Sequence, residues 1–167
     1  WLSLLVNAGD GIDLDVFLAR QPKDRMVRKL GQQLRINRSK IKETSDTNTD
    51  FDDLDGAIRS GYFLKDGLSN NEDFYYLNLL ITVTAGSVDD LEWKVAEMKK
   101  LLLSQDMDVQ TCSFCQEQAF LSSLPLVSLE RQLYERSKRN VLTTGAASCY
   151  PFTSYEMCDD NGILLGV

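Results

Sequence analysis

Residues 74–85 constrain the fold more than any other stretch of this chain. They are mostly aromatic, aliphatic or β-branched and none of them is charged, while acidic residues precede them and Gly86 and Ser87 follow. A short apolar run bounded by polar and turn-forming residues predicts a β-strand buried on both faces. Such a strand needs helices or further strands to cover it, which indicates a layered α+β domain.

The next segment predicts a helix and then a second strand. Ser87 suits the N-cap position, and Asp89 and Asp90 would lie in the first turn. Apolar residues then recur at helical spacing through Ser104, namely Val88, Leu91, Val95, Met98 and Leu102. Residues 107–112 are short and alternating, as in a strand. Together these segments predict a βαβ unit with a right-handed crossover.

The rest of the chain predicts a hairpin and several helices. Residues 2–6 and 12–19 are expected to form an N-terminal hairpin, because the glycines of the intervening loop suit positive φ angles. Helices are expected over residues 22–43, 51–65, 114–124 and 127–141. The fold class predicted is therefore α+β, a two-layer mixed sheet with an N-terminal hairpin, a βαβ unit and helices packed on one face.

The domain prediction separates two parts. Residues 1–142 are expected to form an N-terminal α+β domain, and residues 143–167 a connector and the first strand of a second, truncated domain. The apolar run at 163–167 follows a turn and needs a partner strand, so we expect the chain to be a piece of a longer protein.

Composition excludes several classes of protein. The 167 residues carry a net charge of −7, which argues against a molecule that binds nucleic acid over its whole surface. The sequence contains no apolar run long enough to cross a membrane. Four unevenly spaced cysteines are typical of reduced intracellular thiols, and we expect a cytoplasmic protein.

One helix concentrates the positive charge. Residues 20–42 contain nine of the 18 basic residues of the chain and one acid, Asp24. A candidate interaction surface is formed by Lys23, Arg25, Arg28, Lys29, Arg35, Arg38, Lys40 and Lys42. It could contact nucleic acid or anionic lipid headgroups. The alternative, which we favour, is a solvated helix whose positive side faces the acidic residues 44–55 or a partner protein.

No pattern in the chain predicts catalysis. Cys112 and Cys115 form a CxxC pair suited to redox chemistry or zinc, but two core thiols are favoured because further ligands are missing. Residues 46–50 begin like a calcium loop, yet Phe51 and Ala57 stand where glycine and glutamate are needed. The chain has no histidine and no phosphate-binding loop. We therefore predict no catalytic, cofactor-binding or metal-binding residue.

Three segments resemble a known family. They are residues 116–126 (QEQAFLSSLPL), 142–152 (LTTGAASCYPF) and 161–166 (NGILLG). These sequences resemble the conjugative ATPases of type IV secretion systems, most closely the versions carried by conjugative elements of Gram-positive bacteria. In that family an N-terminal α+β domain precedes a RecA-like motor domain, and the three segments mark the junction.

The resemblance implies a docking or assembly module of an ATPase that energises DNA or protein transfer. The ATP and magnesium site of the parent protein would lie beyond Val167, so no nucleotide-binding residue is expected here. The implied partners are membrane-embedded components of the transfer channel, with self-association, weak contact with nucleic acid, and peripheral contact at the inner face of the cell membrane. The alternatives are a stand-alone nucleic-acid-binding or regulatory α+β domain that uses the basic helix at residues 22–43, and a small enzyme.

Overall fold

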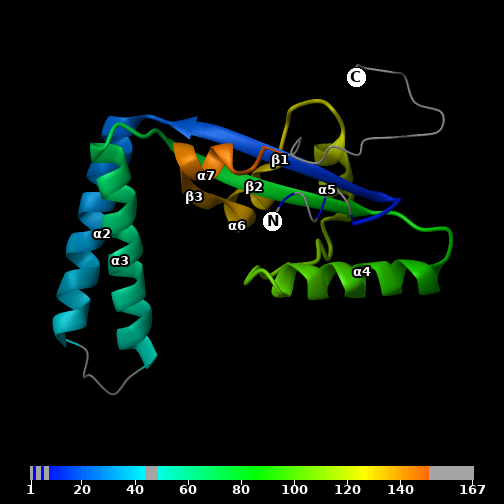
Figure 1. The fold of residues 1–167 in the computed structure, drawn as a ribbon, viewed down its shortest axis with the longest axis horizontal. Coiled ribbons are helices and arrows are strands. Elements are labelled where there is room, and N and C mark those ends of the chain that lie inside the picture. Colours follow the sequence, from blue (N-terminus) through cyan, green and yellow to red (C-terminus); the bar gives the residue numbers. More distant parts are fainter. Residues whose placement is uncertain (1, 3–4, 6–7, 44–48, 151–167) are drawn as a thin grey trace. The chain divides into compact units, whose positions relative to one another are not determined.

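A computed structural model describes residues 2, 5, 8–43 and 49–150 of the chain. Helices separate the three strands along it (Figure 1). In chain order the elements are β1 (Ile12–Gln21), α2 (Lys23–Glu43), α3 (Thr49–Ser69), β2 (Phe74–Val83), α4 (Val88–Leu103), α5 (Gln116–Ser123), α6 (Arg131–Ser137), β3 (Arg139–Leu142) and α7 (Thr143–Ala147).

The three strands form one antiparallel sheet in the order β1-β2-β3. The register of β2 and β3 places Phe74 opposite Leu142 and Leu77 opposite Arg139. The predicted strand at residues 74–85 is therefore confirmed as the central strand, and the α+β class is confirmed with it.

The chain divides into two compact units. Unit 1 comprises Trp1–Leu14, Ile81–Gln116 and Cys149–Val167, and unit 2 comprises Asp15–Leu80 and Glu117–Ser148. The predicted boundary near Leu142 stays a prediction, and the strand expected at residues 163–167 lies outside the described residues.

In unit 2, α2 and α3 pack against each other as a helical hairpin. The apolar residues Met26, Leu30 and Leu34 recur every four positions and are buried on one side of α2, as expected for an amphipathic helix. On α3, a Cβ built at Gly61 would lie 2.8 Å from Leu34 Cδ2. Gly61 is thus a point of close approach between α2 and α3.

The prediction of a helix over residues 22–43 is confirmed. The second helix was predicted over residues 51–65 and runs further, from Thr49 to Ser69. It ends in a Schellman-type turn, because Asn71 has a φ of 70° and the Glu72 amide donates to the Gly67 carbonyl at 3.0 Å.

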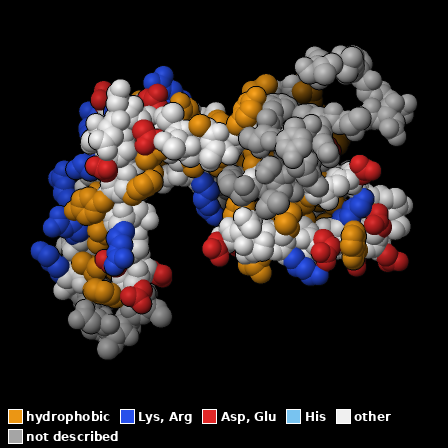
Figure 2. All heavy atoms as spheres, in the orientation of Figure 1, with side chains coloured by type: hydrophobic (Ala, Val, Ile, Leu, Met, Phe, Trp, Pro, Cys, Tyr) orange, Lys and Arg blue, Asp and Glu red, His pale blue; other side chains and the backbone are white. Residues whose placement is uncertain are grey.

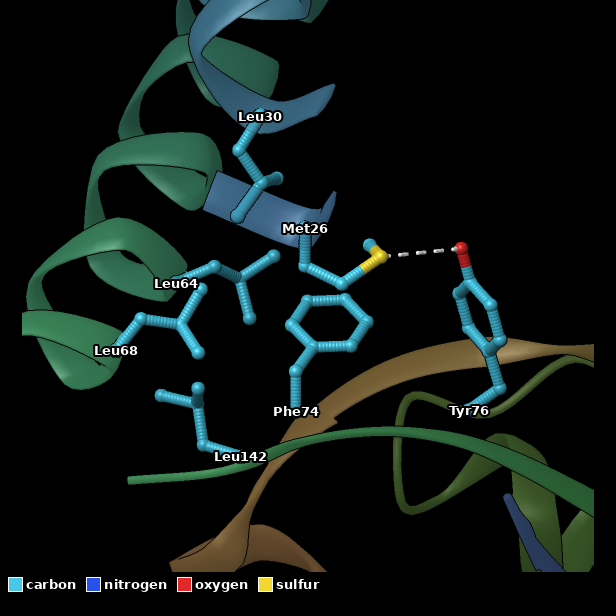
Figure 3. Packing of buried hydrophobic residues seen from close by; sticks show 7 residues of the cluster. All are labelled: Met26, Leu30, Leu64, Leu68, Phe74, Tyr76 and Leu142. Carbon is cyan, nitrogen blue, oxygen red and sulfur yellow. Dashed lines mark hydrogen bonds between the residues drawn. The ribbon is translucent and has the colours of Figure 1, made fainter. Parts of the chain in front are cut away.

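The core of unit 2 lies where this hairpin meets the sheet (Figure 3). Phe74 is fully buried and meets Tyr76 edge to face, with ring centroids 5.6 Å apart. The Tyr76 hydroxyl donates to Met26 Sδ at 3.9 Å. The remaining members of this core are Leu30, Leu64, Leu68 and Leu142. Burial of each such side chain stabilises the fold by about 1.5–3 kcal/mol.

A buried amide holds α6 to the same face of β2. Asn78 alternates with Phe74 and Tyr76 along the strand, so its side chain leaves the same face. Its Nδ2 donates to the Tyr134 carbonyl at 2.9 Å and to Ser137 Oγ at 2.7 Å. Within unit 2, the predicted packing of helices on one face is therefore observed for α2, α3 and α6.

In unit 1, the helix predicted after Ser87 is confirmed. Ser87 Oγ accepts a hydrogen bond from the Asp90 amide at 3.2 Å, and α4 ends at Leu103 with Met98 and Leu102 buried.

A second contact in unit 1 requires a glycine. The Thr84 amide donates to the Gly11 carbonyl at 2.7 Å. Gly11 has a φ of 79°, which only glycine adopts readily.

The predicted βαβ unit is wrong, because residues 107–112 form no strand. After α4 the chain turns through Asp106, whose φ is 55°, and the Met107 amide returns to the Leu102 carbonyl at 3.0 Å. Both edges of β2 are already occupied by β1 and β3. No edge of β2 remains for a parallel strand, so the predicted mixed sheet is antiparallel instead.

The second strand of the predicted N-terminal hairpin, residues 12–19, is confirmed as β1, but its pairing with residues 2–6 is wrong. Leu2 and Leu5 have helical geometry and are buried, and β1 pairs with β2 instead.

The helix predicted over residues 127–141 is confined to Arg131–Ser137, and β3 follows at once. Lys138 at this junction has a ψ of 131°, which breaks the helix. The helix predicted over 114–124 begins later, at Gln116, because Phe114 has a φ of 63°.

Two glycines of α3 should respond oppositely to substitution by alanine. A Cβ at Gly56 meets no atom within 4 Å, so Gly56→Ala should stabilise the protein by about 0.5–1 kcal/mol through helix propensity. A Cβ at Gly67 would lie 2.2 Å from Leu142 Cδ1 in the core, so Gly67→Ala should cost about 1–3 kcal/mol. Urea denaturation of both variants tests this, and equal effects would contradict the placement of α3.

Glu72 should make stability depend on pH. Its Oε2 accepts from the Thr144 amide at 2.9 Å and from Thr144 Oγ1 at 2.8 Å, and these bonds lower the pKa of Glu72. A carboxyl with a lowered folded pKa stabilises the fold above its unfolded pKa, and this contribution disappears as pH falls through the folded pKa.

Glu72→Gln should therefore be less stable than the parent protein at pH 7, and the difference should vanish in acid. Chemical denaturation at a series of pH values measures it. A stability difference that is the same at pH 3 and pH 7 would contradict this role of Glu72.

Candidate interaction surface

The predicted basic surface lies on the side of α2 that faces away from its buried stripe. Arg28, Arg35 and Lys42 are exposed and follow one another at intervals of seven residues. Seven residues are almost two helical turns, so these side chains lie in line along the helix, about 10 Å apart. Figure 2 shows Lys and Arg side chains gathered along α2.

A shallow hollow adjoins this line of side chains. It has a volume of about 270 Å³ and is lined by Arg35, Arg38, Ser39 and Lys42. Arg38 Nη1 donates to the Tyr62 hydroxyl of α3 at 3.2 Å, which ties the guanidinium to the partner helix. We call Arg28, Arg35, Arg38 and Lys42 the basic row.

The other predicted residues have different positions. Lys29 points toward the sheet, where its Nζ donates to the Tyr76 hydroxyl at 3.1 Å and lies 5.7 Å from the centre of the Tyr76 ring. Lys23 is half-buried at the start of α2, while Arg25 and Lys40 are exposed. Lys29 is thus exposed like the basic row, but its ammonium contacts the sheet.

The basic row has no ion pair with any residue that the structure describes. The acids and bases nearby pair locally instead: Arg59 with Asp55 at 2.6 Å within α3, and Arg20 with Asp73 at 2.8 Å. The positive side of α2 is therefore not neutralised by the described part of the acidic segment 44–55, although residues 44–48 lie outside the described residues. Unpaired cations on one helix face create a local positive potential in a chain of net charge −7.

The described residues show no arrangement suited to metal chemistry or to a membrane span. They hold no cluster of three or more potential metal-ligating side chains. Cys112 and Cys115 flank a turn in which the Cys115 amide donates to the Cys112 carbonyl at 3.2 Å. None of the described helices has the length and apolar character needed to cross a membrane.

Sequence reasoning missed the contribution of α3 to this surface. Tyr62 belongs to the apolar pattern of α3, and such a pattern by itself indicates only packing. Its side chain is partly exposed and positions Arg38. The only available signal was a hydroxyl on an otherwise apolar stripe, which does not identify a partner on another helix.

Adjacent cations of α2 should behave differently when their charge is reversed. Lys29→Glu should destabilise the protein by about 1 kcal/mol, because it removes the hydrogen bond and the cation–π contact with Tyr76. Arg28→Glu should leave stability within about 0.5 kcal/mol of the parent, since Arg28 is exposed and forms no ion pair with a described residue. Thermal melts of the two variants test this. A larger loss of stability in Arg28→Glu than in Lys29→Glu would mean that Arg28, and not Lys29, contacts the sheet.

No protein-family model matches the chain, and no curated protein or solved structure shows significant similarity to it. Function is therefore inferred from the surface of α2 and from the three sequence segments.

Proposed function

We propose that the chain is a docking and assembly module of a conjugative transfer ATPase, and that the basic row of α2 is its docking surface. The observation that carries the docking role is the set of exposed cations without ion pairs to described residues, on a helix anchored by the Phe74 core. The resemblance of residues 116–126 and 142–152 to the conjugative ATPases supports the family. In this proposal the parent protein binds ATP and magnesium elsewhere.

The partner we propose is an acidic protein surface of a membrane-embedded component of the transfer channel. A chain of net charge −7 repels a polyanion at long range, so the basic row favours a partner with localised carboxylates over a long nucleic acid. Three of its four members are arginines, whose planar guanidinium groups bind carboxylates in a bidentate manner. The module would then act in the cytoplasm, at the inner face of the membrane.

A nucleic-acid reader is the second candidate. The hollow brings together the side chains of Arg35, Arg38, Ser39 and Lys42, and cations with a hydroxyl group are common ligands of phosphate. In this case affinity should survive physiological salt and depend on sequence or strandedness.

Fluorescence anisotropy across a salt series distinguishes the two candidates. The probes are single- and double-stranded oligonucleotides and a short fluorescein-labelled polyglutamate peptide, whose few carboxylates are localised as in the proposed partner. A docking module should bind the oligonucleotides weakly and without sequence preference, and lose them by about 0.15 M salt. Polyglutamate binding should be lost in the triple variant Arg28→Glu, Arg35→Glu, Arg38→Glu.

A charge-matched variant controls for net charge. Lys65→Glu, Lys99→Glu and Arg131→Glu together change the charge equally at other exposed positions, and this variant should retain more of the polyglutamate binding. Tight, salt-resistant oligonucleotide binding that only the α2 variant loses would contradict the docking role and support the nucleic-acid reader.

A further inference from the structure

A second surface in unit 2 lies between α3 and the edge of the sheet. Here the structure has a hollow of about 590 Å³, lined by Arg59, Ser60, Phe63 and Leu64 of α3 and by Arg139 and Asn140 of β3. We call it the edge hollow. None of its lining residues belongs to α2, so this surface is separate from the basic row and its role is independent of the docking function proposed above.

The edge hollow follows the border of the sheet instead of one face. Arg139 and Asn140 are consecutive residues of β3, and consecutive side chains of a strand point to opposite faces. The hollow adjoins both residues, as expected at the edge of β3 that β2 does not occupy. Because β3 is last in the order β1-β2-β3, the described part of the chain places no strand on its outer side.

The outer edge of a strand presents backbone amides and carbonyls that an extended chain can pair with. Arg139 and Asn140 are already paired on their inner side, opposite Leu77 and Tyr76 of β2. The four residues of β3 would accommodate a short added strand, which is the geometry of peptide recognition by strand addition.

The side chains around the edge hollow define what such a strand should carry. Phe63 is 70% exposed and adjoins the buried Leu64, so an apolar side chain would find a large aromatic surface. Arg59 and Arg139 supply positive charge, and no acidic residue lines the hollow. Arg59 shares its charge with Asp55 at 2.6 Å, whereas Arg139 has no ion pair with any described residue.

We propose that an extended acidic segment of a partner protein binds in the edge hollow by adding a strand to β3. One residue of the segment contributes a carboxylate to Arg139, and an apolar side chain packs on Phe63. Charge complementarity favours an acidic peptide, and the free edge of β3 favours an extended one.

The test uses fluorescein-labelled hexapeptides and the full chain. The probe peptide alternates glutamate and valine, and two comparison peptides carry lysine in place of glutamate or N-methyl groups on alternate amides. Anisotropy titrations at about 0.1 M salt should show binding of the acidic probe, weakened at least about tenfold by either change to the peptide. N-methylation removes backbone donors and leaves charge intact, so it isolates strand addition from simple attraction.

Variants of the protein locate the site. Arg139→Glu and Phe63→Ser should each lower the affinity for the acidic probe at least about tenfold. Arg139→Gln should have an intermediate effect. Since both side chains are exposed, these variants should melt close to the parent, and a thermal melt verifies that they fold. The α2 triple variant should weaken binding of the acidic probe no more than the charge-matched variant Lys65→Glu, Lys99→Glu, Arg131→Glu does.

Three results would overturn the proposal. One is the absence of measurable binding of the acidic probe to the parent protein. The second is equal binding of the N-methylated peptide, which would exclude pairing with β3. The third is binding that survives Arg139→Glu and is lost in the α2 triple variant, because this would assign the acidic peptide to the basic row.

Discussion

The burial of Phe74 between the helical hairpin and the sheet is the contact on which the rest of unit 2 depends. Its ring packs with side chains of α2, α3 and β2 and with Leu142 at the end of β3, so elements distant in the chain share one core. Tyr76 extends this core toward α6 through its ring contact with Tyr134 at 6.1 Å. Both proposed binding surfaces are carried by elements that this core positions.

The two surfaces illustrate how position decides the role of a charged residue. Lys29 and Arg28 are neighbours in sequence, yet Lys29 meets the Tyr76 ring and Arg28 faces solution. Similarly, Arg59 pairs within α3 while Arg139 stands at a strand edge without an ion pair to any described residue. Charge that the fold does not neutralise is available for a partner, which is why we place binding on α2 and at the edge of β3.

Local patterns predicted α2, α3, α4, β1 and β2, but not the pairing of the strands. Residues 22–43 and 88–104 carry complete periodic stripes with start signals, and both helices were predicted nearly to their ends. β3 was missed because four residues after Lys138 are too few to show a period. The basic residues of α2 were visible as a group, whereas their division between Tyr76 and solvent, and the edge hollow, depend on contacts between distant segments.

Native-state hydrogen exchange of the parent and of Phe74→Ala tests most directly whether one core holds the hairpin to the sheet. In the parent, amides around Met26, Leu30 and Leu64 should be as protected as those of β2 near Tyr76. In Phe74→Ala, which should cost about 3–5 kcal/mol, protection should fall together in α2, α3 and β2. If α2 and α3 kept their protection while β2 lost it, the hairpin would be stable without this core, and the account would be contradicted.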